Sequence, residues 1–150
     1  MKIQFKLAWV SGTVNAKAFK QSAAWEMFEE YRKRIGHFVS CEASGLSVKD
    51  SRRPGQLWWF CDRGPKAKIL SSEEVAEAIE NVRTSSVREW VIVIGGPDGY
   101  TPADFERFAP ERRWSFGTMT LPHELASIVA AEQIYRGLTI LANHPYHSGH

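Results

Sequence analysis

The chain is poor in the features that mark specialised classes of protein. It has only two cysteines, Cys41 and Cys61, among 150 residues, and it has no internal repeat or low-complexity segment. No apolar run approaches the roughly 20 residues that a membrane-spanning helix needs, and no secretory hydrophobic segment follows the first two residues. These absences argue against a disulfide-stapled scaffold, a repeat protein and a helical membrane protein. We expect a single domain over residues 1–150, cytoplasmic, with reduced thiols and no membrane partner.

An excess of one charge is also lacking. The chain has 19 Lys and Arg residues against 17 Asp and Glu residues, a formal net charge of +2. A protein that holds nucleic acid by bulk charge alone would be far more basic. If RNA is the substrate, its binding must depend on a local patch, a second subunit or a structured target.

The apolar periodicity predicts an α/β fold with a mainly parallel sheet flanked by helices, because strand-like and helix-like segments alternate. Trp58 and Trp59 are adjacent in one predicted strand and should point to opposite faces. Strands are predicted at 3–10, 37–43, 57–61 and 90–94, with 114–121 as a strand that leads into a loop. Helices are predicted at 15–34 with Asn15 as cap, at 71–84 with a Ser71–Glu74 capping box, from Pro102, and after Pro122.

A glycine-rich turn, Gly95-Gly96-Pro97-Asp98-Gly99, directly follows the strongest predicted strand. Ligands of α/β proteins bind at the carboxyl ends of strands, and glycines let the backbone approach a ligand closely. The turn is neither a dinucleotide fingerprint nor a P-loop. A purely structural turn between strand and helix fits the local sequence equally well.

Residues 115–123 form a second candidate ligand site. Small and hydroxylated residues stand there beside Phe116 and Met119, and they could wall a slot for an adenine edge and ribose hydroxyls. The alternative is a strand followed by a helix that Thr120 caps.

Four histidines fall late in the chain, at His123, His144, His147 and His150. We expect no metal site, because the cysteines are distant and no helix presents His144 and His147 on one face. The last three histidines lie in a tail that we expect to be irregular and mobile. A histidine held in a cleft could instead act as a general base.

Glu132 and Arg136 lie four residues apart in the last predicted helix, so the simplest expectation is an ion pair. The alternative is that they orient the tail or an RNA phosphate.

Four motifs occur in order and at close spacing between residues 90 and 147. They are the glycine turn at 93–99, Trp-Ser-Phe-Gly-Thr-Met-Thr-Leu-Pro-His at 114–123, Glu-Gln-Ile-Tyr-Arg at 132–136, and Asn-His-Pro-Tyr-His at 143–147. Together they resemble the SPOUT-class methyltransferases that methylate N3 of a pseudouridine in 23S ribosomal RNA. The N-terminal half of the chain agrees with that family only in the order of its elements.

This resemblance implies a fold and a ligand site. The fold is an α/β domain with a C-terminal deep trefoil knot, in a homodimer that binds ribosomal RNA or an assembled ribosome across the subunit interface. The methyl donor is S-adenosyl-L-methionine, held in the knot. The implied donor-binding residues are Phe60, Gly95, Phe116, Gly117, Thr118, Met119, Thr120 and Leu121.

The catalytic residues that the resemblance suggests lie in the tail and beside the donor loop. Removal of a proton from the pseudouridine N3 would assist methyl transfer, so a general base is expected. His147, next to Tyr146, is the first candidate, and His123 is the second. The alternatives are a methyltransferase for another nucleotide, a non-catalytic RNA- or ribosome-binding relative, and a generic nucleotide-binding α/β protein.

The chain departs from the family pattern in two RNA-facing places. Family members have a longer stretch, usually with a helix, where only the polar loop 44–56 stands here. They often place Lys or Arg directly after the tail Tyr-His, whereas Ser148-Gly149-His150 follows here. We therefore expect an intact donor site beside an altered RNA-binding surface.

Overall fold

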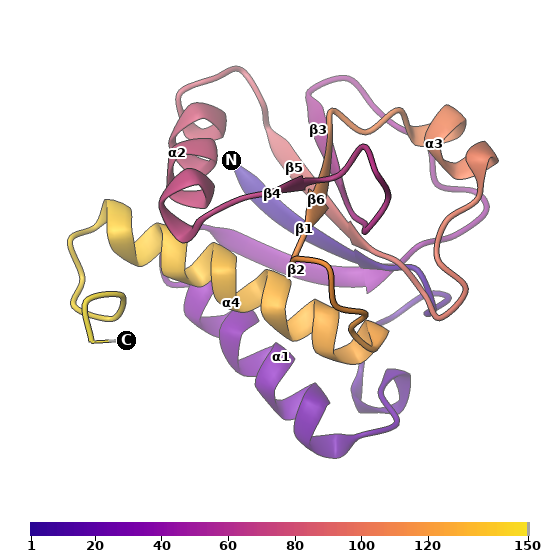
Figure 1. The fold of residues 1–150 in the computed structure, drawn as a ribbon, viewed down its shortest axis with the longest axis horizontal. Helices are drawn as coiled ribbons and strands as arrows, with labels where there is room; N and C mark the ends of the chain where they lie inside the picture. Colours follow the sequence, from indigo (N-terminus) through magenta and orange to yellow (C-terminus); the bar gives the residue numbers. More distant parts are fainter. Residues whose placement is uncertain (150) are drawn as a thin grey trace.

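Six strands form one sheet at the centre of the computed structural model, which describes residues 1–149 (Figure 1). Their order across the sheet is β2-β1-β5-β3-β6-β4, and every neighbouring pair is parallel. The predicted mainly parallel α/β fold is therefore confirmed. The strands are β1 (Lys2–Leu7), β2 (Ser40–Gly45), β3 (Gln56–Cys61), β4 (Lys68–Ile69), β5 (Glu89–Ile94) and β6 (Arg112–Ser115).

Helices cover both faces of the sheet. α1 (Ser22–Ile35), α2 (Ser72–Arg83) and α4 (His123–Leu141) lie on one face, with α4 packed against both others. The short α3 (Pro102–Phe108) covers the opposite face, where Phe108 stacks on Trp58 with ring centroids 4.7 Å apart. The sheet thus separates two apolar clusters, as expected of a parallel sheet buried on both sides.

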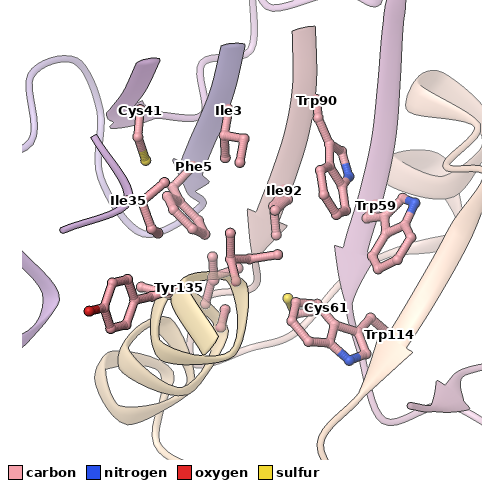
Figure 2. Packing of buried hydrophobic residues seen from close by; sticks show 14 of the residues in the cluster. Ile3, Phe5, Ile35, Cys41, Trp59, Cys61, Trp90, Ile92, Trp114 and Tyr135 are labelled. Carbon is pink, nitrogen blue, oxygen red and sulfur yellow. The ribbon is translucent and has the colours of Figure 1, made fainter. Parts of the chain in front are cut away.

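Strand β3 contributes to both clusters. Trp58 and Phe60 face α3, whereas Trp59 and Cys61 face the three-helix layer. Trp59 meets Trp90 edge to face at 4.8 Å and Trp114 edge to face at 5.7 Å, and Figure 2 shows all three rings. The prediction that the two adjacent tryptophans point to opposite faces is confirmed, and core packing accounts for them.

Several predicted boundaries were wrong for identifiable reasons. Asn15 caps only the short 3₁₀ turn Ala16–Ala18, accepting from the Lys17 N–H at 2.9 Å, and α1 begins later, at Ser22. The second strand starts at Ser40, because the N–H groups of His37 and Phe38 still bond to carbonyls at the end of α1. The strand expected at 114–121 ends at Ser115.

Two local predictions hold and one element was missed. The Ser71–Glu74 capping box is present in both directions at the start of α2. The loop between β2 and β3 contains no helix. Strand β4 is only two residues long, too short for any periodicity to indicate it. The trefoil knot stays a prediction. Within residues 1–149, no helix has the length and apolarity to cross a bilayer.

Candidate functional site

A cavity of about 760 Å³ opens where β3, β5 and β6 end. Its volume lies in the range of pockets that enclose small-molecule ligands. Three chain segments line it, and they contain both stretches that the sequence singled out. The lining residues are 61–64 at the end of β3, 94–100 at the end of β5, and 116, 117, 119–123 and 126 before and within the start of α4.

The glycine turn forms one wall. Gly99 has φ +71 and its N–H donates to the Gly96 carbonyl at 3.0 Å, so the turn closes on itself. A Cβ built on Gly95 would lie 3.1 Å from the Tyr100 ring. A side chain at position 95 would therefore push Tyr100 out of its place.

Tyr100 is a wall residue that the sequence analysis missed. Its hydroxyl lies 2.9 Å from the Cys61 carbonyl and 3.0 Å from the Val93 carbonyl, and donates to this pair. Burial raises the pKa of Tyr100 well above its usual value, so the hydroxyl stays protonated as a donor. Tyr100 thereby ties the ends of β3 and β5 together at the edge of the cavity.

Phe60 does not line the cavity. It is fully buried on the α3 side of the sheet and stacks under the Tyr100 ring at 4.6 Å. From there it can affect a ligand only through Tyr100.

The loop before α4 forms the opposite wall. Phe116, Gly117, Met119, Thr120 and Leu121 line the cavity, and the exposed Thr118 does not. Gly117 has φ +111, and the Ser115 hydroxyl both donates to its carbonyl and accepts from its N–H at 3.1 Å. The alternative role of Thr120 as a helix cap is wrong, because α4 starts from Pro122 without a side-chain cap.

His123 belongs to the cavity as well. Its ring lies 4.5 Å from that of Trp9, and its Nε2 is 3.8 Å from Glu124 Oε2. The buried Glu124 carboxylate accepts from the N–H groups of Lys20 at 2.9 Å and Gln21 at 3.2 Å. Glu124 was missed too, and it joins the cavity loop to the start of α1.

The described tail residues do not line this cavity. Tyr146 donates from its hydroxyl to Glu132 Oε1 at 3.0 Å and packs edge to face on Tyr135 at 4.7 Å. Burial, the Tyr31 hydroxyl and the Glu132 carboxylate raise the pKa of Tyr146. The tail that was expected to be mobile thus folds back onto α4, and the Glu132–Arg136 ion pair beneath it is confirmed at 2.6 Å.

His147 is held between two charged side chains. Its Nδ1 lies 3.0 Å from Arg136 Nη1 and its Nε2 lies 3.0 Å from Glu73 Oε1. Arginine can only donate, so Nδ1 accepts and the proton sits on Nε2, facing Glu73. His147 therefore contacts α4 far from the cavity, because Arg136 lies 13 residues beyond the cavity residue His123, roughly 20 Å along the helix axis.

Residues 1–149 contain no group of three His, Cys, Asp or Glu side chains arranged to hold a metal ion. His144 accepts the Tyr146 N–H through Nδ1 at 3.1 Å, which is a local turn contact. His150 lies outside the described residues.

Comparison with known proteins gives a consistent result. Residues 54–147 match a family model described as "Predicted SPOUT methyltransferase". A protein of Koribacter versatilis, named ribosomal RNA large subunit methyltransferase H, is 35 % identical over 99 % of this chain and 100 % of its own length. Proteins of the same name from Stenotrophomonas maltophilia and Gloeobacter violaceus are 37 % and 39 % identical, over 80 % and 89 % of this chain and 86 % and 87 % of their own lengths.

Proposed function

The chain belongs to the SPOUT methyltransferase family, and from this premise we propose that it methylates ribosomal RNA with S-adenosyl-L-methionine as the donor. The observation that carries the proposal is the cavity at the ends of β3, β5 and β6, which Gly95 and the 116–121 loop line. The target that we propose is N3 of a pseudouridine in 23S ribosomal RNA.

The cavity residues fit this donor. Gly117 offers bare backbone to open space, since a Cβ there would meet nothing within 4 Å. Phe116, Met119 and Leu121 offer apolar surface for an adenine ring. Asp62 and Arg63 bring charges of both signs to the wall, as the ammonium and carboxylate of the donor's amino-acid end require.

The chemistry asks little of the protein. The bound donor supplies an activated methyl group, and the chain's own residues position the acceptor, exclude water and take up one proton. His123 already lies in the cavity wall. His147 would act only after leaving Arg136, because that guanidinium occupies its accepting nitrogen.

We further propose that the enzyme is a homodimer with a knotted C-terminal segment, in which the tail of one subunit meets the cavity of its partner. The separation between tail and cavity within one subunit supports this arrangement, because His147 contacts α4 about 20 Å from the cavity end of that helix.

Donor binding and methyl transfer together test the proposed function. S-adenosylmethionine at ~100-fold its Kd should stabilise the fold by roughly 2.7 kcal/mol in thermal unfolding. Radiolabelled methyl should pass to the 23S rRNA of ribosomes from cells that lack the gene, at one pseudouridine by mass mapping. Gly95→Val should abolish both results by displacing Tyr100, whereas Ser86→Val, at an exposed position outside both the cavity and the tail, should abolish neither.

A protein that binds the donor but transfers no methyl group would contradict the enzymatic proposal and favour a non-catalytic relative. Preference for ATP or NAD over S-adenosylmethionine would contradict the donor assignment.

A further inference from the structure

A depression of about 250 Å³ at the β4–β6 edge of the sheet gathers positive charge. Of its six lining residues, four are cations contributed by two segments more than 40 positions apart. The lining residues are Lys66, Lys68, Pro110, Glu111, Arg112 and Arg113. In a chain with a net charge of only +2, such a cluster is not explained by overall composition.

The one acidic residue of the depression does not neutralise it. Glu111 pairs through Oε1 with Arg52 and accepts the Trp58 N–H through Oε2 at 2.7 Å, so both of its oxygens are engaged elsewhere. Among residues 1–149, Lys66, Lys68, Arg112 and Arg113 form no ion pair with any carboxylate. Their charge is therefore available to an external anion.

Aromatic rings hold the two arginines in place. The Arg112 guanidinium lies 5.0 Å from the centre of the Trp59 ring on the three-helix face, and that of Arg113 lies 3.6 Å from the centre of the Phe105 ring on the α3 face, so the two arginines flank the edge of the sheet. Stacking on a ring leaves the edge of a guanidinium free to donate hydrogen bonds. Two of the four cations are thus fixed before any partner arrives, which lowers the entropic cost of binding.

The loop after β3 connects the proposed donor cavity to the depression along the chain. Asp62, Arg63 and Gly64 line the cavity, and the same loop carries Lys66 onward into β4, where Lys68 lies in the depression. Arg63 is exposed and forms no ion pair within residues 1–149. We name Arg63, Lys66, Lys68, Arg112 and Arg113 the basic strip. It extends from the loop after β3 to the β4–β6 edge of the sheet, whose strands are labelled in Figure 1.

We propose that the basic strip binds the phosphate backbone of the RNA whose base enters the cavity, an inference that rests on the proposed function. Phosphates are the anions that Arg and Lys contact in most protein–nucleic acid interfaces, and they set position without reading sequence. The strip thereby supplies the local patch that the mild net charge requires.

The test compares two charge-matched double variants. Lys66→Glu/Lys68→Glu reverses two cations of the strip, and Lys17→Glu/Lys33→Glu reverses two exposed lysines elsewhere. Binding to protein-free 23S rRNA is measured by filter retention between 50 and 200 mM salt, and the S-adenosylmethionine Kd by calorimetry. The strip variant should weaken RNA binding at least tenfold and reduce the salt slope by about 1.4 to 1.8, because each of the two lost phosphate contacts removes roughly 0.7–0.9. Donor affinity should not change.

The outcomes separate the two proposals. If both variants weaken RNA binding equally, or the strip variant does not weaken it, the basic strip does not bind the RNA backbone. The proposed methylation of RNA by the wild-type protein is unaffected by that result. A wild-type protein that binds RNA without methylating it overturns the proposed function. The salt slope of RNA binding still tests whether the basic strip contacts phosphates. A wild-type protein that neither binds 23S rRNA nor methylates ribosomes overturns both.

Discussion

Tyr100 supports the cavity through one hydroxyl group. Tyr100→Phe keeps the stack on Phe60 but removes the bonds to the Cys61 and Val93 carbonyls. We expect a loss of about 1–2 kcal/mol in the free energy of unfolding, since a buried hydrogen bond contributes about that much. Donor affinity should also fall several-fold, because the ends of β3 and β5 are released. Urea titration and calorimetry measure the two effects, and unchanged values would mean that the hydroxyl does not hold this wall.

The two thiols predict how stability depends on alkaline pH. Burial raises the pKa of Cys41 to about 12, and burial followed by the nearby Asp62 charge raises that of Cys61 as well. The folded thiols stay protonated to higher pH than the thiols of the unfolded chain, whose pKa is roughly 8.5. Their contribution to the free energy of unfolding is therefore complete below about pH 8.5 and is lost as the pH rises toward about 12. The free energy of unfolding should therefore decline above pH 9.

Lys and Tyr residues also titrate in this range, so Cys41→Ala/Cys61→Ala serves as the control. The double variant should show a smaller decline between pH 9 and 10.5 in urea titrations than the wild-type protein. The same slope in both would show that other groups cause the decline.

The two candidate general bases, His123 and His147, lead to opposite predictions for methyl transfer by their alanine variants. If the tail supplies the base, His147→Ala should lower single-turnover methylation of ribosomes by about 10²-fold or more, with little change in donor Kd. If the cavity histidine supplies it, His123→Ala should do so instead. Unchanged turnover in both variants would leave positioning and desolvation of the acceptor nitrogen as sufficient.

At the scale of helices and strands, Glu124 caps a helix that is distant in sequence. Glu124→Gln keeps the side-chain volume but removes the charge that accepts from the Lys20 and Gln21 N–H groups. Losing a charge-assisted cap should cost about 1–2 kcal/mol in unfolding free energy.

Hydrogen exchange locates the effect of Glu124→Gln. Amides of residues 20–25 should exchange faster, while those at the start of α2 should not, because the Ser71–Glu74 capping box is untouched. Uniform acceleration would point to global destabilisation rather than to loss of a cap.

The elements that the sequence predicted well are those with local causes. The Ser71–Glu74 box and the apolar run of β5 are readable within a few residues. Tyr100 also has a local sequence signal. It precedes the Thr101 cap, and its ring packs 5.5 Å from Phe105 as a hydrophobic staple at the start of α3.

Other features had no local signal. Glu124 acts on residues more than 100 positions away, and the basic strip joins residues 63–68 to 112–113. Only the folded sheet brings these segments together. For the same reason the positions of His123 inside the cavity and His147 outside it could not be read from their spacing in the chain.

At the scale of the whole molecule, exposed apolar side chains favour self-association. Met27 on α1, Leu125 on α4 and Met119 in the loop before α4 are 49 %, 43 % and 74 % exposed. We expect light scattering at micromolar concentration to give about twice the mass of one chain, and Met27→Glu/Leu125→Glu to give a single-chain mass. A monomeric wild-type protein would contradict a site shared between subunits.

The strand order also constrains how the chain folds during its synthesis. β1 can pair with β2 as soon as both have left the ribosome, but β3 has only β5 and β6 as neighbours. The apolar run Leu-Trp-Trp-Phe-Cys must therefore wait, unpaired, until residues 89–94 have been synthesised. At roughly 5–20 residues per second that interval lasts a few seconds. During each round of synthesis, this tryptophan-bearing strand is the segment that chaperones would have to shield from other nascent chains.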